Sequence, residues 1–241
     1  MLEARAPSEG FVHLDPDTWL SPNTLPAARH AAGAAVLATE LVLEGRIATA
    51  FCCVRPPGHH AGKASAMGFC YYNNIAVAAA HALASGAVER VAILDFDVHH
   101  GNGTEEIFLQ DDRVLLCSSY QHPFYPYTGA ASEPGHIANV PLPAGTKGSE
   151  FRKAIEAQWL PEIDRFSPQF IFVSAGFDAH AGDPLAQLQL TVDDYIWITQ
   201  RILDLADKHA AGRIVSSLEG GYALNALAAS ACAHVRALAG L

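Results

Sequence analysis

Short apolar runs alternate with longer helix-like stretches along most of the chain, and this alternation limits the folds open to it. The runs predict strands at 49–54, 90–94, 114–118, 170–174 and 213–218. Helices are predicted between them at 27–44, 74–84, 104–109, 150–163, 193–209 and beyond 221. This order is typical of an α/β fold with a mostly parallel sheet and helices on both faces. The chain has 241 residues, half of them hydrophobic, and shows no repeat or linker, so we expect a single domain over 1–241.

Composition argues against several classes of function. The net charge is −10 and lysines and arginines do not cluster, so we expect no binding of nucleic acid. No apolar stretch is long enough to predict a membrane span. The five cysteines show no metal-binding or redox spacing, which favours a reducing compartment. These features predict a cytoplasmic protein.

Each of the richest polar loops begins where a predicted strand ends. The four loops read RPPGHHAG from position 55, DVHHG from 97, SAGFDAHAGDP from 174 and EGGY from 219. Because ligands bind at the carboxyl ends of the strands in such sheets, we expect the four loops to form one pocket.

The loop after the second predicted strand has the spacing of a metal site. Asp97 and His99 are two residues apart, so an extended backbone places both side chains on one side, with Asp95 one step deeper. A catalytic zinc site takes three protein ligands and leaves one position open. Asp183 is the candidate third ligand. By itself, Asp183 between Gly182 and Pro184 is more typical of a turn, but the other three loops favour a ligand.

The other loops contribute proton-transfer and hydrogen-bonding groups. His59 and His60 have reference pKa values suited to acid–base chemistry near neutrality, although a polar loop without function is a comparable interpretation. Asp95 and Asn102 are candidate partners of the two histidines, one ionic and one neutral. Tyr222 follows Gly221 and is a candidate oxyanion donor, the alternative being a tyrosine packed on a turn. Together these groups indicate hydrolysis of an amide or ester by metal-activated water.

Five motifs, in order RPPGHHA, GFCYYNN, LDFDVHHGNGT, SAGFDAHAGDPL and LEGGY, resemble those of the zinc-dependent histone deacetylase family. That family includes bacterial deacetylase-like amidohydrolases and acetylpolyamine amidohydrolases, and Asn102 is similar to its class II members. The resemblance implies an arginase/deacetylase-like fold, zinc on Asp97, His99 and Asp183, and proton transfer by His59 and His60. It also implies oxyanion stabilisation by Tyr222.

The same resemblance implies a substrate tunnel and a second ion. The tunnel and its gate would be formed by Gly68, Phe69, Tyr125, Leu190 and Gly221. A structural potassium ion would lie near Asp95, Asp97, His99, Ser118 and Ser119. An apolar residue at position 190 favours acyl-lysine or simple ester substrates over polyamines.

Unlike the family pattern, the chain starts close to the first predicted helix. We therefore expect an open pocket and a sheet edge that is covered by homo-oligomerisation. The leading interpretation is hydrolysis of acetyl-lysine-like amides in small molecules or peptides, with small carboxyl esters as further substrates. The alternatives are an acetylpolyamine or other small-amide hydrolase and a weakly active acyl-group binding module. A two-metal, arginase-like hydrolase would need more carboxylate ligands than this sequence offers.

Overall fold

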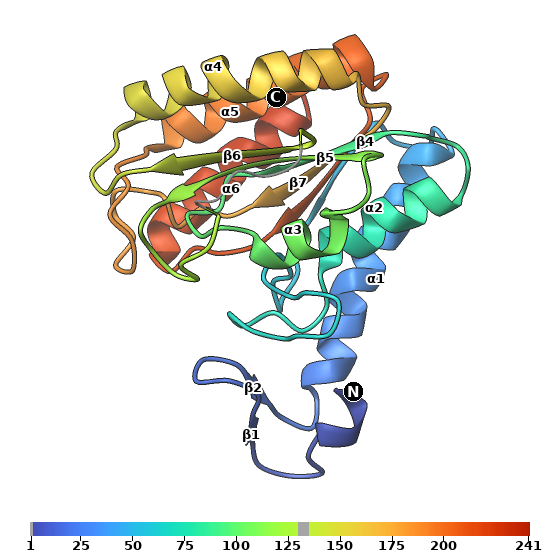
Figure 1. The fold of residues 1–241 in the computed structure, drawn as a ribbon, viewed down its shortest axis with the longest axis vertical. Helices are drawn as coiled ribbons and strands as arrows, with labels where there is room; N and C mark the ends of the chain where they lie inside the picture. The colour runs from blue at the N-terminus through green and yellow to red at the C-terminus, as the bar shows by residue number, and fades with distance from the viewer. Residues whose placement is uncertain (1, 130–134) are drawn as a thin grey trace.

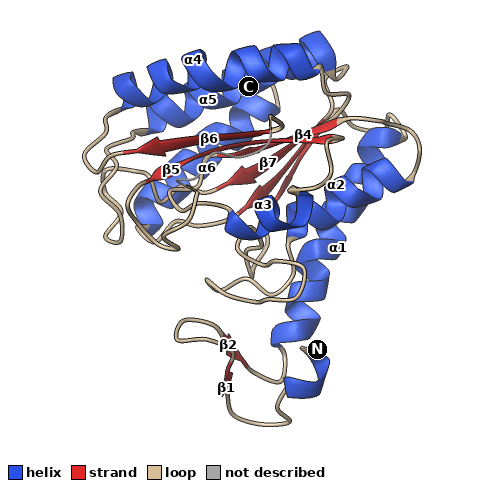
Figure 2. Cartoon of the chain, viewed as in Figure 1, coloured by secondary structure: helices blue, strands red, loops and turns tan. Residues whose placement is uncertain are grey.

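A computed structural model describes residues 2–129 and 135–241 of the chain. Its centre is a six-stranded sheet in which every neighbouring pair is parallel, in the order β3-β8-β7-β4-β5-β6 (Figures 1 and 2). The strands are β3 (Thr49–Cys52), β4 (Val91–Asp95), β5 (Val114–Gln121), β6 (Ile137–Leu142), β7 (Ile171–Ala175) and β8 (Ile214–Leu218). The predicted α/β class is therefore confirmed.

Helices cover both faces of the sheet, as Figure 1 shows. They are α1 (Thr24–Leu43), α2 (Asn74–Ala84), α3 (Asn102–Phe108), α4 (Gly148–Phe166), α5 (Val192–His209) and α6 (Leu224–Leu238). Alternate residues of β4 enter opposite cores: Val91 and Ile93 pack with α1 and α2, whereas Ala92 and Leu94 pack with α4 and α5. A strand buried on both faces explains the continuous apolar run of its sequence.

The register of the inner strands aligns their carboxyl ends. Asp95 at the end of β4 pairs with Ser118 of β5 on one side and with Ser174 of β7 on the other. Leu218, the last residue of β8, pairs with Ala175 of β7. The polar loops that follow β4, β7 and β8 therefore leave the same edge of the sheet.

Two parts of the fold were not predicted. The strand β6 reads IANVPL, in which asparagine and proline interrupt the apolar pattern; it lies at the sheet edge, where proline is tolerated. The N-terminal segment forms a short helix, η1 (Glu3–Arg5), and a small hairpin of β1 (Val12–His13) and β2 (Trp19–Leu20).

Part of the predicted loop at 120–135 falls on residues 130–134, which lie outside the described residues. Within the described part of the chain, no helix is both long and apolar enough to cross a membrane.

Candidate active site

A cavity of about 310 Å³ opens at the edge of the sheet where the predicted loops meet. The four polar groups His59, His60, Asp97 and His99 line it, together with Tyr222 from the loop after β8. Residues from three of the four quoted stretches, and Leu185 directly after the fourth, thus share this cavity.

The two adjacent histidines have different hydrogen-bond partners. Nδ1 of His59 lies 2.9 Å from Oδ2 of Asp95, whereas Nδ1 of His60 lies 2.7 Å from Oδ1 of Asn102. Because the amide oxygen of Asn102 can only accept, Nδ1 of His60 carries the proton. Nε2 of His60 therefore keeps its lone pair.

These partners move the two pKa values in opposite directions. Burial alone would lower the pKa of His59, but the carboxylates of Asp95 and Asp97 outweigh burial and raise it well above its ordinary value. Burial and the charge of His59 lower the pKa of His60 well below its ordinary value. The loop thus presents one cationic and one neutral imidazole, nearly side by side.

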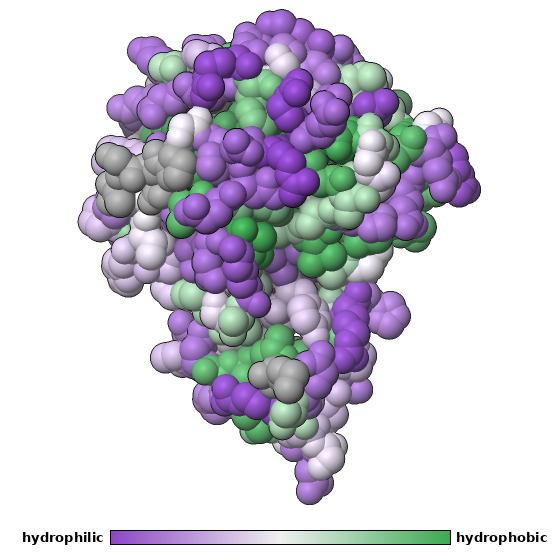
Figure 3. Space-filling view, turned by 45° about the vertical axis from the view of Figure 1, so that its right-hand side comes forward, coloured by the Kyte–Doolittle hydropathy of each residue, from purple (hydrophilic) through white to green (hydrophobic). Residues whose placement is uncertain are grey.

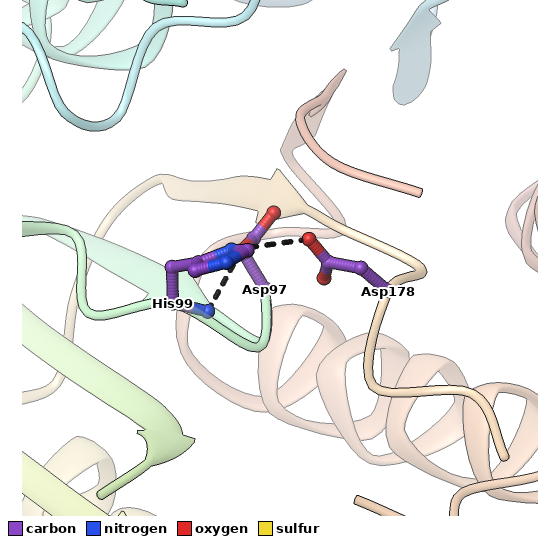
Figure 4. A group of neighbouring side chains, drawn as sticks. All are labelled: Asp97, His99 and Asp178. Atoms are coloured by element: carbon purple, nitrogen blue, oxygen red, sulfur yellow. Dashed lines mark hydrogen bonds and ion pairs between the residues drawn. The ribbon is translucent and has the colours of Figure 1, made fainter. Parts of the chain in front are cut away.

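A compact group of metal-ligating atoms lies next to the histidines. Asp97, His99 and Asp178 each offer one atom, and these atoms all lie within 4.8 Å of one another (Figure 4). Nδ1 of His99 is 3.0 Å from Oδ1 of Asp97 and 3.2 Å from Oδ2 of Asp178. Burial would lower the pKa of His99, but hydrogen bonds to Asp178 and Asp97 raise it to about 10. The group therefore favours positive charge at this position.

The predicted third metal ligand is held by backbone hydrogen bonds. Asp183 is outside the compact group: Oδ2 of Asp183 accepts the backbone N–H groups of Tyr222 (2.8 Å) and Ala223 (3.3 Å). Its Oδ1 accepts the N–H of Leu185 at 3.0 Å. Asp178, five positions earlier in the same loop, was not singled out, because the sequence does not show which acid of a long loop turns inward.

Glycines allow the loop after β8 to come close to the acids. A Cβ atom on Gly220 would lie 2.1 Å from Oδ2 of Asp178 and 2.7 Å from Oδ2 of Asp97. The N–H of Gly220 also donates to Oδ2 of Asp97 at 2.8 Å. The next residues are Gly221, with φ of +141°, and Tyr222. Burial raises the pKa of Tyr222 far above its ordinary value, so its phenol stays protonated.

Aromatic side chains and a glycine form the walls of the cavity. The ring of Phe124 stacks on His99 with centroids 5.2 Å apart, and the ring of Tyr125 lies 5.3 Å from that of His60. Phe69 lies opposite, 6.3 Å from the ring of Tyr222. A Cβ atom on Gly68 would lie 2.4 Å from the His60 ring, so only glycine fits there.

At the mouth, the structure departs from the predicted gate. Leu190 is 1% exposed and packs in the core between the sheet and α5, and it does not line the cavity. Leu185, which is 52% exposed, lies there instead, together with Asp17. Sequence reasoning missed Asp17 because it precedes the first helix, far from the recognisable motifs.

The predicted potassium site also contains unpartnered polar atoms. The hydroxyl oxygens of Ser118 and Ser119 are buried and have no hydrogen-bond partner among the described residues. Asp95 is fully buried beside Ser118 in the sheet. Buried polar atoms without a partner are costly unless something coordinates them.

Comparisons with known proteins identify the family. Residues 2–238 match the histone deacetylase domain. The chain is 42% identical to a probable deacetylase of Archaeoglobus fulgidus, over 92% of this chain and 63% of that protein. It is 44% identical to a histone deacetylase-like amidohydrolase of Pseudomonas aeruginosa, over 87% of this chain and 57% of that protein.

A solved structure shows the same fold. The crystal structure of the HDA15 HD domain superposes with a TM-score of 0.89 at 42% identity, covering 95% of this chain and 66% of that one. The chain thus spans less than two thirds of the two curated relatives above. With the family pattern matched over almost its whole length, the chain belongs to the histone deacetylase domain family.

Proposed function

We propose that this chain hydrolyses acyl amides, with acetyl-lysine-like amides as the leading substrates and small carboxyl esters as further ones. The observation that carries the proposal is the pair of differently partnered histidines, His59 and His60, beside the acid–imidazole group of Asp97 and His99. A neutral base next to a group that favours positive charge suits hydrolysis by activated water.

The residues present fit a zinc ion. Carboxylate and imidazole are zinc ligands, and the buried Oδ2 of Asp178 has only the contact with Nδ1 of His99 among the described residues. We propose that Asp97, His99 and Asp183 hold the ion, as in the family pattern. In favour of Asp183, its carboxylate accepts a hydrogen bond from the backbone N–H group of the cavity-lining Tyr222. Asp178 is the competing third ligand, because it belongs to the compact group with Asp97 and His99.

Each remaining polar group has a distinct proposed role. A bound zinc ion would polarise the substrate carbonyl and acidify the attacking water. His60, neutral and with Nε2 free, accepts the proton of that water, while the cationic His59 stabilises developing negative charge. The phenol of Tyr222 donates a hydrogen bond to the carbonyl oxygen as charge develops. A Tyr222→Phe variant that keeps both its zinc and full turnover would contradict this last role.

The test of the function is a substrate panel on purified protein. Turnover of an acetyl-lysine peptide, acetylputrescine and an aryl acetate is measured with and without a hydroxamate chelator. We expect chelator-sensitive turnover that is highest for the peptide. Faster hydrolysis of acetylputrescine would favour the small-amide alternative. Stoichiometric zinc with hydroxamate binding but no turnover of any substrate would favour a binding module.

The third ligand is tested by two matched substitutions. We expect Asp183→Asn to lose zinc, because a neutral amide is a poorer ligand than a carboxylate, and Asp178→Asn to keep most of it. Zinc per chain is measured by mass spectrometry on protein whose folding is checked by circular dichroism. The reverse pattern would assign the ligand to Asp178.

We also propose that a potassium ion is bound by the buried oxygens around Ser118 and Ser119 near Asp95. The support is the two hydroxyl oxygens without a partner. Replacing sodium by potassium at equal ionic strength should raise the melting temperature of the wild type but not of Ser118→Ala. Equal responses of the two proteins would count against this site.

A further inference from the structure

Glu219 is a buried acid that the proposed chemistry does not use. It follows the last residue of β8, and it is 0% exposed. Its Oε2 accepts the backbone N–H groups of Gly58 at 2.7 Å and of His59 at 3.1 Å. Its Oε1 accepts the hydroxyl of Ser174 at 3.1 Å. Among the described residues, it does not line the cavity.

The loop that carries His59 and His60 finds hydrogen-bond acceptors for two of its backbone N–H groups on Glu219. Pro56 and Pro57 have no N–H group, so Gly58 is the first residue after them that can donate a backbone hydrogen bond. On its other side the loop is close-packed, since a Cβ atom on Gly58 would lie 2.4 Å from the backbone nitrogen of Asn74 in α2. The backbone just before the two histidines is therefore held between the start of α2 and one carboxylate.

Burial of the Glu219 carboxylate is unfavourable, and its hydrogen-bond donors compensate for the lost hydration. Burial raises the pKa of Glu219 to about 7, against the opposing effects of His59 and the Gly58 N–H group. Burying an acid is unfavourable unless hydrogen bonds compensate it. Two of its three donors belong to the backbone of the histidine loop, so the contact that makes burial tolerable is also the contact that fixes the loop.

We propose that Glu219 is a positioning residue, which fixes the Gly58–His59 backbone so that the two imidazoles meet Asp95 and Asn102. This inference rests on the proposed function of the histidines. Displacement of catalytic groups by about 1 Å can cost about a hundredfold in rate. Because Glu219 does not reach the cavity, its loss lowers kcat and leaves KM nearly unchanged.

The test compares three substitutions with one control. Glu219→Ala removes both acceptors, and Glu219→Asp keeps the charge but shortens the side chain. Glu219→Gln keeps one oxygen for the two N–H groups and turns its amide toward Ser174. We expect kcat to fall about tenfold or more in the alanine and aspartate variants, with recovery in the glutamine variant. Ser174→Ala, which removes only the third donor, should stay within about twofold of wild type.

A readout without substrate separates this inference from the proposed function. The backbone ¹H–¹⁵N signals of Gly58 and His59 should move upfield in Glu219→Ala and Glu219→Asp, return in Glu219→Gln, and stay in place in Ser174→Ala, with zinc content unchanged throughout. If Glu219→Ala does not fold, the amide signals and kcat of the aspartate and glutamine variants test the proposal.

Three outcomes would overturn the proposal: unmoved amide signals, a rise in KM at constant kcat, or wild-type kcat in the aspartate variant with shifted amide signals. If instead the wild type turns over no substrate while the amide signals shift as expected, the proposed function fails and the loop contact stands.

Discussion

Two neighbouring side chains with the same chemistry differ here because their partners differ in charge. Asp95 holds His59 as a cation, whereas Asn102 offers His60 only an amide oxygen. The neutral partner fixes the tautomer of His60 and raises its pKa less than a carboxylate would, so burial and the charge of His59 keep the pKa low. At the scale of single residues, the proposed role of His60 as the base therefore depends on the side chain at position 102.

Asn102→Asp should raise the pKa of His60, since an anionic partner stabilises the imidazolium. The base form of His60 is lost below its pKa, so the acid limb of the pH profile of kcat/KM should move to higher pH. Zinc content is measured in parallel to exclude loss of the metal. An acid limb at the wild-type position in a zinc-loaded variant would remove His60 as the base.

At the scale of elements, what the sequence predicts depends on periodicity. The helix predicted at 74–84 is observed as Asn74–Ala84, because its apolar pattern and its flanking asparagine are local signals. The strand β6 and the inward turn of Asp178 depend on tertiary contacts, and no local pattern announces them. Loop sequences thus predict which types of residue come together at the site, whereas tertiary packing determines which individual side chain of a loop points into it.

His234 of α6 links three elements in the core behind the site. Its Nδ1 lies 2.7 Å from Oγ1 of Thr199 in α5, and its Nε2 lies 2.9 Å from Oγ of Ser216 in β8. The Thr199 hydroxyl already donates to the carbonyl of Tyr195, so it accepts from Nδ1 of His234. In a neutral imidazole Nε2 then accepts from the Ser216 hydroxyl, and complete burial favours this uncharged form.

Burial lowers the pKa of His234 from 6.5 to about 3. Between these values the unfolded state binds a proton that the folded state does not, so stability falls as the pH falls through this window. The slope approaches about 1.4 kcal/mol per pH unit. Urea unfolding at pH 6 and below should show this loss in wild type and in the exposed-histidine control His30→Gln, and a shallower loss in His234→Gln. Equal slopes in all three would contradict a neutral His234.

At the scale of the whole molecule, the net charge is negative, and an exposed acid lines the cavity. The chain carries 25 acidic against 15 basic residues, and Asp17 lies at the mouth. Hydrophilic side chains cover most of the face in Figure 3, with apolar surface in smaller areas between them. Such a surface attracts cationic substrates over distances that salt screens.

The rate of capture should therefore depend on salt and on substrate charge. We expect kcat/KM for an acetyl-lysine peptide of net positive charge to fall as ionic strength rises, and kcat/KM for a neutral aryl acetate to stay constant. Steady-state kinetics across a sodium chloride series, at fixed potassium, checks both. A parallel fall for the two substrates would indicate a general effect of salt on the enzyme instead of steering.

The order of the strands has a consequence for biosynthesis. The last two strands, β7 and β8, lie between β3 and β4, although both are synthesised after β6. Until β7 and β8 have been made, the strand β3 and the fragment β4-β5-β6 have unpaired facing edges. Such edges invite wrong association until translation delivers the missing pair. The sheet edge that carries the pocket is therefore complete only after the last strand, β8, has been made.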